Sequence, residues 1–317
     1  MRTPVIPCLP SFRRIPRPGR LATGLIFLAG LALIAPPEAT SGVAWGGGVR
    51  LDAEHTSDLF PGGDFAESAS LIRLTLSPQF QFRVRNALRI RPWFDLEVER
   101  HDGFEARDLE RQVLGVDLRH GPGRLRLYHG WTNHELYFPS RGGGAYLDRR
   151  IDGAELRLAV APDIQLRGGI EHESDDFVPT HQERDGRRWV TRLGVERGAA
   201  KGLRTAATWF FRDTKSTTDL YTYRQNMLRL DVEGTMRGAW HGAARVEGGL
   251  RNYDTGAEYA SNFGRQDHRW RARLAMAHPV AGPVAAEAYH AWRQTESSRV
   301  SKGSVVRTIG LALTYDR

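Results

Sequence analysis

The sequence predicts an all-β protein, an antiparallel up-and-down transmembrane β-barrel of about 14 strands, and three observations support this fold class. Apolar and polar residues alternate with a period of two through most of the chain, as expected for strands whose two faces meet different surroundings. Short turns fall at every second connection and longer polar loops at the others, which is typical of transmembrane barrels. An apolar run of 15 residues behind a basic N-terminus indicates export.

The N-terminal segment has the organisation of a secretory signal peptide. Residues 1–20 carry five arginines and no acidic residue, residues 21–35 are apolar, and small residues follow at 39–42. The apolar run is shorter than the ~20 residues that a membrane-spanning helix needs. We therefore expect two parts, a cleaved signal peptide over 1–41 and an outer-membrane barrel over 42–317.

Removal of this leader changes how the composition is interpreted. The formal charge falls from +8 to +4, and the single cysteine, Cys8, is lost. A high isoelectric point therefore gives no support for a nucleic-acid partner. A single cysteine also excludes a disulfide scaffold and any cysteine-based metal site.

The strands follow one another in a regular order. From Ile72 the even positions are mostly apolar and the odd positions polar, and the same alternation returns after Leu88, after Leu228 and before the C-terminus. A soluble β-sandwich shows the same alternation, but it has no reason to keep short turns at every second connection. The expected strands span 44–54, 67–84, 88–100, 107–119, 123–133, 146–160, 164–174, 187–197, 202–213, 222–236, 240–253, 265–279, 284–296 and 304–316.

The last predicted strand carries the most specific motif. Thr308 to Tyr315 fit the pattern polar-x-Gly-x-x-apolar-x-apolar, with Thr308, Gly310, Leu313 and Tyr315 at its defining positions. This pattern resembles the C-terminal insertion signal of Gram-negative outer-membrane barrel proteins, although Asp316 and Arg317 follow where a terminal aromatic residue is usual. Strand number and chain length are similar to those of monomeric 14-stranded porins. The resemblance implies an outer-membrane location, contact with outer-membrane lipid and lipopolysaccharide, and the barrel-assembly machinery as a partner.

The polar faces of the strands are rich in arginine and carboxylates, and in a barrel they would line the lumen. A guanidinium group stays charged and matches carboxylate and phosphate geometry. Fourteen strands also enclose more space than the eight whose interior side chains can fill. The predicted pore-lining residues are Arg73, Arg83, Arg85, Arg89, Arg91, Asp95, Glu97, Arg124, Arg126, Arg157, Arg167, Arg192, Arg229, Asp231, Glu233, Arg245, Glu247, Arg271 and Arg273.

These residues predict a passive channel for small polar or anionic solutes, acting through the width and field of its lumen. Within this set, Arg83, Arg85, Arg89 and Arg91 surround the first short turn and would ring the periplasmic mouth. The alternative is that arginine–carboxylate pairs close the lumen. The protein would then be a structural or interaction barrel whose outer loops, such as 56–65 and 175–186, serve adhesion, export or assembly.

Other chemistry finds less support in the sequence. Two histidines, His129 and His134, lie near Ser140, but their spacing fits no hydrolase pattern, so no catalytic residue and no enzyme activity are expected. The acidic run Glu173 to Asp176 has oxygen ligands for a divalent cation, but such runs are common in outer loops, and neither a metal nor a cofactor is predicted.

Overall fold

The computed structural model describes residues 43–57, 68–84, 88–102, 108–136, 144–177, 179–198, 202–254, 262–299 and 303–316. The chain divides into two units, Met1–Thr40 and Ser41–Arg317, and all described residues belong to the second. The predicted leader lies outside the described residues. No α-helix in the described part has the length and apolar character needed to cross a membrane.

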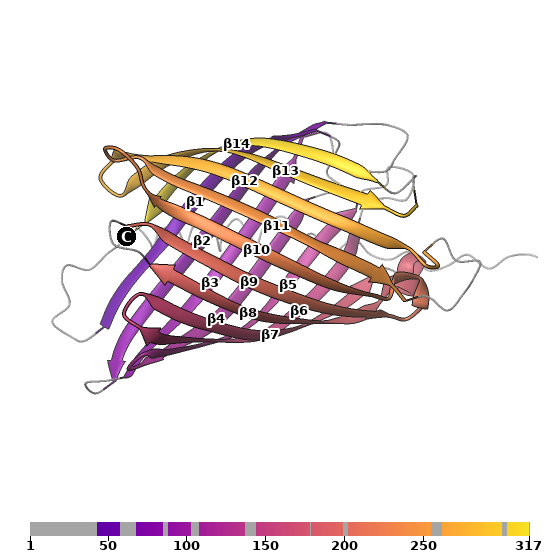
Figure 1. Cartoon of the computed structure of the whole chain (residues 1–317), viewed down its shortest axis with the longest axis horizontal. Helices are drawn as coiled ribbons and strands as arrows, with labels where there is room; N and C mark the ends of the chain where they lie inside the picture. Colours follow the sequence, from indigo (N-terminus) through magenta and orange to yellow (C-terminus); the bar gives the residue numbers. More distant parts are fainter. Residues whose placement is uncertain are drawn as a thin grey trace, which may run out of the picture. The chain divides into compact units, whose positions relative to one another are not determined.

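Fourteen antiparallel strands form one closed barrel, in which each strand pairs with its neighbours in the sequence and the first pairs with the last (Figure 1). The strands are β1 (Val43–Thr56), β2 (Ala69–Val84), β3 (Leu88–His101), β4 (Leu109–His120), β5 (Gly123–Leu136), β6 (Gly144–Ala161), β7 (Ile164–Phe177), β8 (Gly186–Gly198), β9 (Arg204–Ser216), β10 (Tyr223–Thr235), β11 (His241–Tyr253), β12 (Gln266–Ala281), β13 (Val284–Ser297) and β14 (Ser304–Asp316). Two short 3-10 helices, η2 (Pro179–Arg184) and η3 (Asp219–Tyr221), lie in connections.

The structure confirms the predicted fold class and the predicted number of strands. No predicted strand end lies more than three residues from the observed one. Closure joins β1 to β14 from the pair Gly48↔Asp316 to the pair Thr56↔Thr308. An even number of strands makes this closing pair antiparallel like every other pair, so no strand edge is left open.

The two ends of the barrel differ in their connections. The connections β4–β5, β6–β7 and β12–β13 are two-residue turns, and Gly121 and Gly282 within them have φ of +53° and +52°, a left-handed conformation that glycine adopts without steric cost. We call this the short-turn end; β1 begins there and β14 ends there. The opposite, long-loop end carries η2 and η3.

The outward face of the wall is apolar. Alternate side chains along the strands are aliphatic and exposed, among them Ile72, Leu193, Leu274, Ile309 and Leu311, each more than half accessible. Apolar surface of this extent is unusual against water, whereas a lipid-facing barrel wall requires it. The interior of this fold is therefore largely polar, and its exposed large apolar side chains lie on the outside.

Tryptophans also lie on the outward face. Trp189 and Trp270 are near the long-loop end and Trp240 is at the short-turn end, the positions that suit an interfacial aromatic ring. Trp209 instead lies midway along β9, where it stacks on Phe211 with ring centroids 6.1 Å apart. Three of these four tryptophans therefore lie near an end of the barrel, and Trp209 does not.

Candidate functional site

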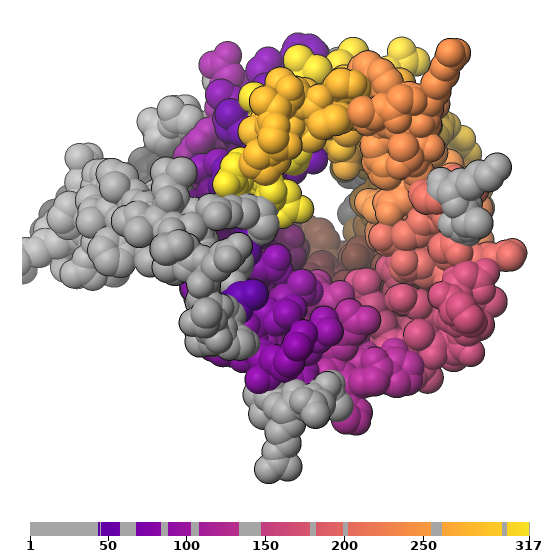
Figure 2. Space-filling model, turned by 90° about the vertical axis from the view of Figure 1, so that its left-hand side faces the viewer, coloured from indigo at the N-terminus to yellow at the C-terminus, as the bar shows by residue number. Residues whose placement is uncertain are grey.

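The barrel is hollow when seen from the short-turn end, with an opening bordered by the C-terminal strands in yellow and orange (Figure 2). One cavity of about 380 Å³ lies against the inner wall formed by β6 to β12. Its charged lining consists of seven arginines and four carboxylates: Arg167, Arg192, Arg204, Arg212, Arg229, Arg245, Arg271, Glu155, Asp231, Glu233 and Glu247.

A second cavity, of about 390 Å³, lies against β10 to β14 and shares Arg229, Arg245, Arg271 and Glu247 with the first. It adds two further arginines, Arg273 and Arg293, and no further carboxylate. We call the arginine-rich inner surface of β7 to β12 the basic wall. The strand period explains it, because every second residue of these strands faces the same space.

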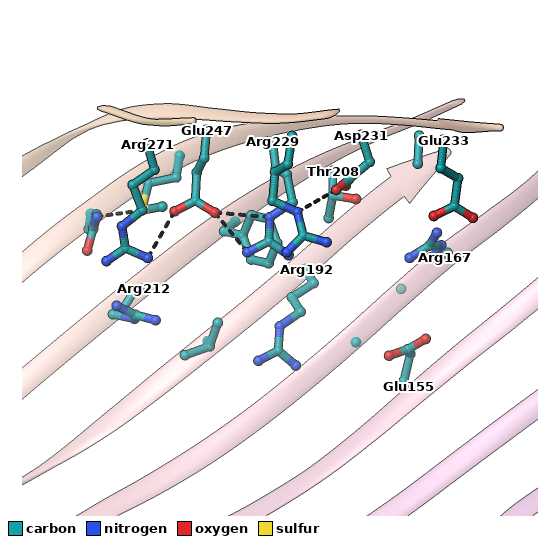
Figure 3. A pocket seen from close by; sticks show the side chains of 18 of the residues that line it. Glu155, Arg167, Arg192, Thr208, Arg212, Arg229, Asp231, Glu233, Glu247 and Arg271 are labelled. Carbon is teal, nitrogen blue, oxygen red and sulfur yellow. Dashed lines mark hydrogen bonds and ion pairs between the residues drawn. The ribbon is translucent and has the colours of Figure 1, made fainter. Parts of the chain in front are cut away.

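Carboxylates in the basic wall are shared between arginines of neighbouring strands. Glu247 is almost fully buried; it accepts hydrogen bonds from Nε and Nη2 of Arg229 at 3.0 and 2.8 Å and lies 3.4 Å from Arg271 (Figure 3). Arg245 donates to Asp231 at 2.5 Å. Such pairs hold the guanidinium groups in place while leaving their other donors facing the cavity.

A separate cluster lies on β3, β4 and β5 towards the short-turn end. Asp117, whose side chain is 3% exposed, accepts hydrogen bonds from Arg91, Arg124 and Arg126, with Arg126 Nε at 2.8 Å. Strand register explains this arrangement, because Asp117 faces Arg91 on one side and Arg126 on the other. Three guanidinium groups on one carboxylate leave the cluster with two excess positive charges.

The inner surface across the barrel closure has the opposite balance. Five carboxylates, Asp52, Glu54, Glu97, Glu99 and Glu287, surround Arg50 and Arg73, and we call this surface the acidic wall. Arg50 Nη2 lies 2.8 Å from Glu287 of β13, and Arg73 lies 2.6 Å from Glu54 and 2.5 Å from Glu99. The charges of the lumen are therefore segregated, with excess negative charge beside β1 and excess positive charge along β7 to β12.

The predicted lumen-facing residues share the inner face of the barrel wherever the structure describes them. Most of them form the two cavities, the Asp117 cluster or the acidic wall. Arg157 binds Glu155 at 2.5 Å, and Asp95 acts electrostatically on Arg126. Arg83 and Arg89 face each other in register and are exposed at the short-turn end, whereas Arg85 lies outside the described residues.

Several inner-face residues were not predicted. Three of them, Arg50, Asp52 and Glu54, occupy alternate positions of β1. The sequence shows this alternation, but the glycines before it make the beginning of the strand hard to recognise. Arg188, Arg212, Arg251 and Arg269 lie near the long-loop end, where predicted strand limits are least certain and the inward parity is hardest to extend.

The acidic run Glu173 to Asp176 does not form a cation site. Glu173 and Asp175 face the lumen, where Arg188 Nη1 lies 2.5 Å from Glu173 and Arg149 Nε lies 2.6 Å from Asp175. Asp176 lies on the opposite face of the strand, because successive side chains point to opposite faces. Among the described residues no group of three or more potential ligands is placed to hold a metal ion.

The remaining candidates have structural roles or lie outside the description. His129 pairs with Asp152 at 2.7 Å on an exposed surface, and the side chain of His134 and all of Ser140 lie outside the described residues. Trp93 and Tyr289 face the lumen, and an arginine lies over each ring, with Arg126 at 4.9 Å and Arg273 at 4.2 Å from the ring centroids.

The fold is similar to that of solved outer-membrane β-barrel proteins. OmpT of Vibrio cholerae, folded in vitro, superposes with a TM-score of 0.50 at 8% identity over 89% of this chain and 100% of its own. OmpF of Salmonella typhi, in complex with daunomycin, gives a TM-score of 0.50 at 8% identity over 88% and 99%. An anion-selective porin from Comamonas acidovorans gives 0.49 at 10% identity over 87% and 99%.

At these identities the likeness shows the fold alone. No protein-family model and no curated protein sequence matches the chain.

Proposed function

We propose that this protein is an outer-membrane β-barrel that forms a passive channel for small polar solutes and favours anions. The observation that carries the proposal is the lining of the cavity against β6 to β12, seven arginines against four carboxylates. A wall with excess fixed positive charge raises the local concentration of anions through its field. The arginine side chains need no cofactor to act in this way.

The surface of the barrel supports its placement in a membrane. The exposed aliphatic belt suits a lipid environment, and the short-turn end would face the periplasm because short periplasmic turns and long outer loops are usual in such barrels. We propose that residues 1–41 are cleaved during export. The last strand, with Thr308, Gly310, Leu313 and Tyr315, would be read by the barrel-assembly machinery, and the finished barrel would contact outer-membrane lipid and lipopolysaccharide.

A closed-lumen barrel is the second candidate function, and one observation favours it. Ion pairs join neighbouring strands around much of the wall, from Arg73–Glu99 to Arg229–Glu247. Cross-strand pairs of this kind brace a wall whether or not solutes pass. In that case the outer loops would carry the function, as surfaces for adhesion, export or assembly.

Single-channel recording in a planar bilayer separates the two candidates. The protein is expressed from its full sequence, extracted from membranes in detergent and inserted at low density, and reversal potentials are measured across a KCl gradient. Stable open steps with a reversal potential towards that of chloride are expected. A folded, heat-modifiable barrel that never conducts would contradict the channel and favour the closed-lumen barrel.

A further inference from the structure

Three arginines near the long-loop end of the basic wall form no ion pair with a carboxylate among the described residues. They are Arg212 on β9, Arg251 on β11 and Arg269 on β12. Arg212 and Arg251 lie in one row on either side of Gln225, which pairs with both in register. Arg269 pairs in register with Gly249, which lies two residues before Arg251 on the same face of β11. Because Gly249 has no side chain, it does not separate Arg269 from Arg251.

The carboxylates nearby are already bound by other arginines. Glu171 binds Arg192 at 2.7 Å, and Arg188 and Arg149 hold Glu173 and Asp175. Asp267, opposite Arg251 in register, accepts two hydrogen bonds from Arg265, both at 2.8 Å. This neighbourhood therefore carries three positive charges more than its carboxylates compensate, and we call Arg212, Arg251 and Arg269 the arginine triad.

Tyr223 is the point on which these charges converge. Its side chain is buried, and it lies close to the guanidinium groups of Arg188, Arg212, Arg251 and Arg269. The Arg251 guanidinium lies 4.1 Å from the Tyr223 ring centroid and donates to Gln225 Oε1 at 3.2 Å. Stacking and this hydrogen bond hold Arg251 in one orientation, so little conformational entropy remains to be lost on binding.

Two arginines of the triad have unused hydrogen-bond donors, and one of these two, Arg212, lines open space. Nε of Arg212 and Nε of Arg251 are buried and have no acceptor in the described part of the chain. Arg212 and Gln225 line the cavity of about 380 Å³, and Figure 3 shows Arg212 facing the same space as Arg192 and Arg271. Buried donors without acceptors are costly, and a bound oxyanion would supply several acceptors at once.

We propose that the arginine triad is a binding site for a small phosphate-bearing solute on its way through the channel. Guanidinium groups match phosphate oxygens bidentately, and a phosphate group carries more charge and more acceptors than a single carboxylate. The adjoining cavity leaves room for an organic body attached to that group. This inference rests on the proposed channel function and names the solute class that the channel would favour.

Calorimetric titration of inorganic phosphate into the detergent-extracted protein tests the site without requiring conduction. The wild type is expected to bind phosphate saturably, and Arg212→Gln with Arg269→Gln is expected to weaken binding by about tenfold for each arginine removed. Arg224→Gln is the matched control, because Arg224 lies at the same end, is 60% exposed and faces outward from β10.

A second comparison separates the effect of the planar guanidinium geometry on phosphate binding from the effect of its charge. Arg212→Lys with Arg269→Lys keeps both charges and should bind phosphate more weakly than the wild type but more tightly than the glutamine variant. The glutamine variant should fold as well as the wild type, since neither arginine has an ion pair among the described residues and the removed charges repel each other.

Conductance recorded in parallel distinguishes the two proposals. Saturable phosphate binding that the triad variant loses supports the site, even in a barrel that never conducts. Absence of saturable binding, equal binding by wild type and triad variant, or equal loss in Arg224→Gln would overturn the site, even in a barrel that conducts normally.

Discussion

The phenol ring of Tyr289 in β13 lies directly over Gly310 in β14, where a β carbon would come within 2.2 Å of the Tyr289 Cζ atom. The two residues face each other in register. The Tyr289 hydroxyl donates a hydrogen bond to Glu54 of β1 at 2.5 Å. A single side chain therefore reaches across β14 and joins β13 to β1, at the place where β14 and β1 close the barrel.

Among the described residues the same arrangement occurs twice more on the inner face. Trp93 lies over Gly115 and Tyr128 lies over Gly153, again as direct cross-strand pairs. In each case an aromatic ring covers backbone that the glycine would leave exposed in the lumen. These glycines therefore have a steric role, since any side chain would displace the ring.

We expect Gly310→Ala to destabilise the barrel by about 1–3 kcal/mol, because the added methyl group would overpack against the Tyr289 ring. Adding Tyr289→Ala should recover part of that loss. Denaturant unfolding of the detergent-extracted protein measures both. Gly48→Ala is the control, since its β carbon would meet only Tyr315 O at 3.5 Å and an Asp316 oxygen at 3.8 Å. If Gly310→Ala unfolds like the wild type but assembles poorly in cells, the insertion signal and not packing explains this glycine.

Gly310 illustrates what the sequence could and could not predict. Its place in a C-terminal motif was readable from residues 308–315, but its partner Tyr289 lies in another strand. The two-residue period of a strand predicts which face a residue occupies. Cross-strand partners depend on the register between two strands, and a shift of that register by two residues leaves the alternating pattern unchanged. The fold and the inner face were therefore predictable, and the contacts within it were not.

Asp117→Asn should destabilise the barrel by about 2 kcal/mol, because Arg91, Arg124 and Arg126 would lose the charge that they share. The same variant should increase the preference for anions, since it adds one net positive charge to the lumen. Denaturant unfolding and reversal potentials measure the two effects. Asp152→Asn is the control, because Asp152 is 61% exposed and, within the described part of the chain, pairs with His129 alone; equal effects of both variants would contradict the prediction.

Arg89→Glu should reduce anion selectivity, because Arg89 is an exposed lumen-facing charge at the short-turn end. Reversing a charge about 10 Å from a passing ion in water changes its energy by ~0.8 kcal/mol, about fourfold in local chloride concentration before screening. Reversal potentials at low salt measure this change. Arg197→Glu is the control at the same end, since Arg197 is 68% exposed and faces outward. Unchanged selectivity in Arg89→Glu would exclude a field at this mouth.

The segregation of charge within the lumen could not be predicted from the sequence, for the same reason as the aromatic contacts. Arg50 and Glu287, 2.8 Å apart, are separated by 237 residues, and only closure of the barrel brings them together. The excess of arginine on the polar faces was visible, so a charged lumen was predicted. Its division into an acidic and a basic wall depends on which strands lie side by side around the closed barrel.

Leu228→Arg should destabilise the barrel by about 2–4 kcal/mol in lipid vesicles, because Leu228 lies near the middle of β10, is 51% exposed and faces outward. A charged side chain there would lie in the hydrocarbon region. Ala243→Arg is the matched control, since Ala243 faces the lumen directly opposite Glu233, which would pair with the new guanidinium. Denaturant unfolding from vesicles measures both, and only the first should lose stability. If Leu228→Arg were tolerated as well as Ala243→Arg, the aliphatic face would not contact lipid, and the membrane placement of the barrel would be wrong.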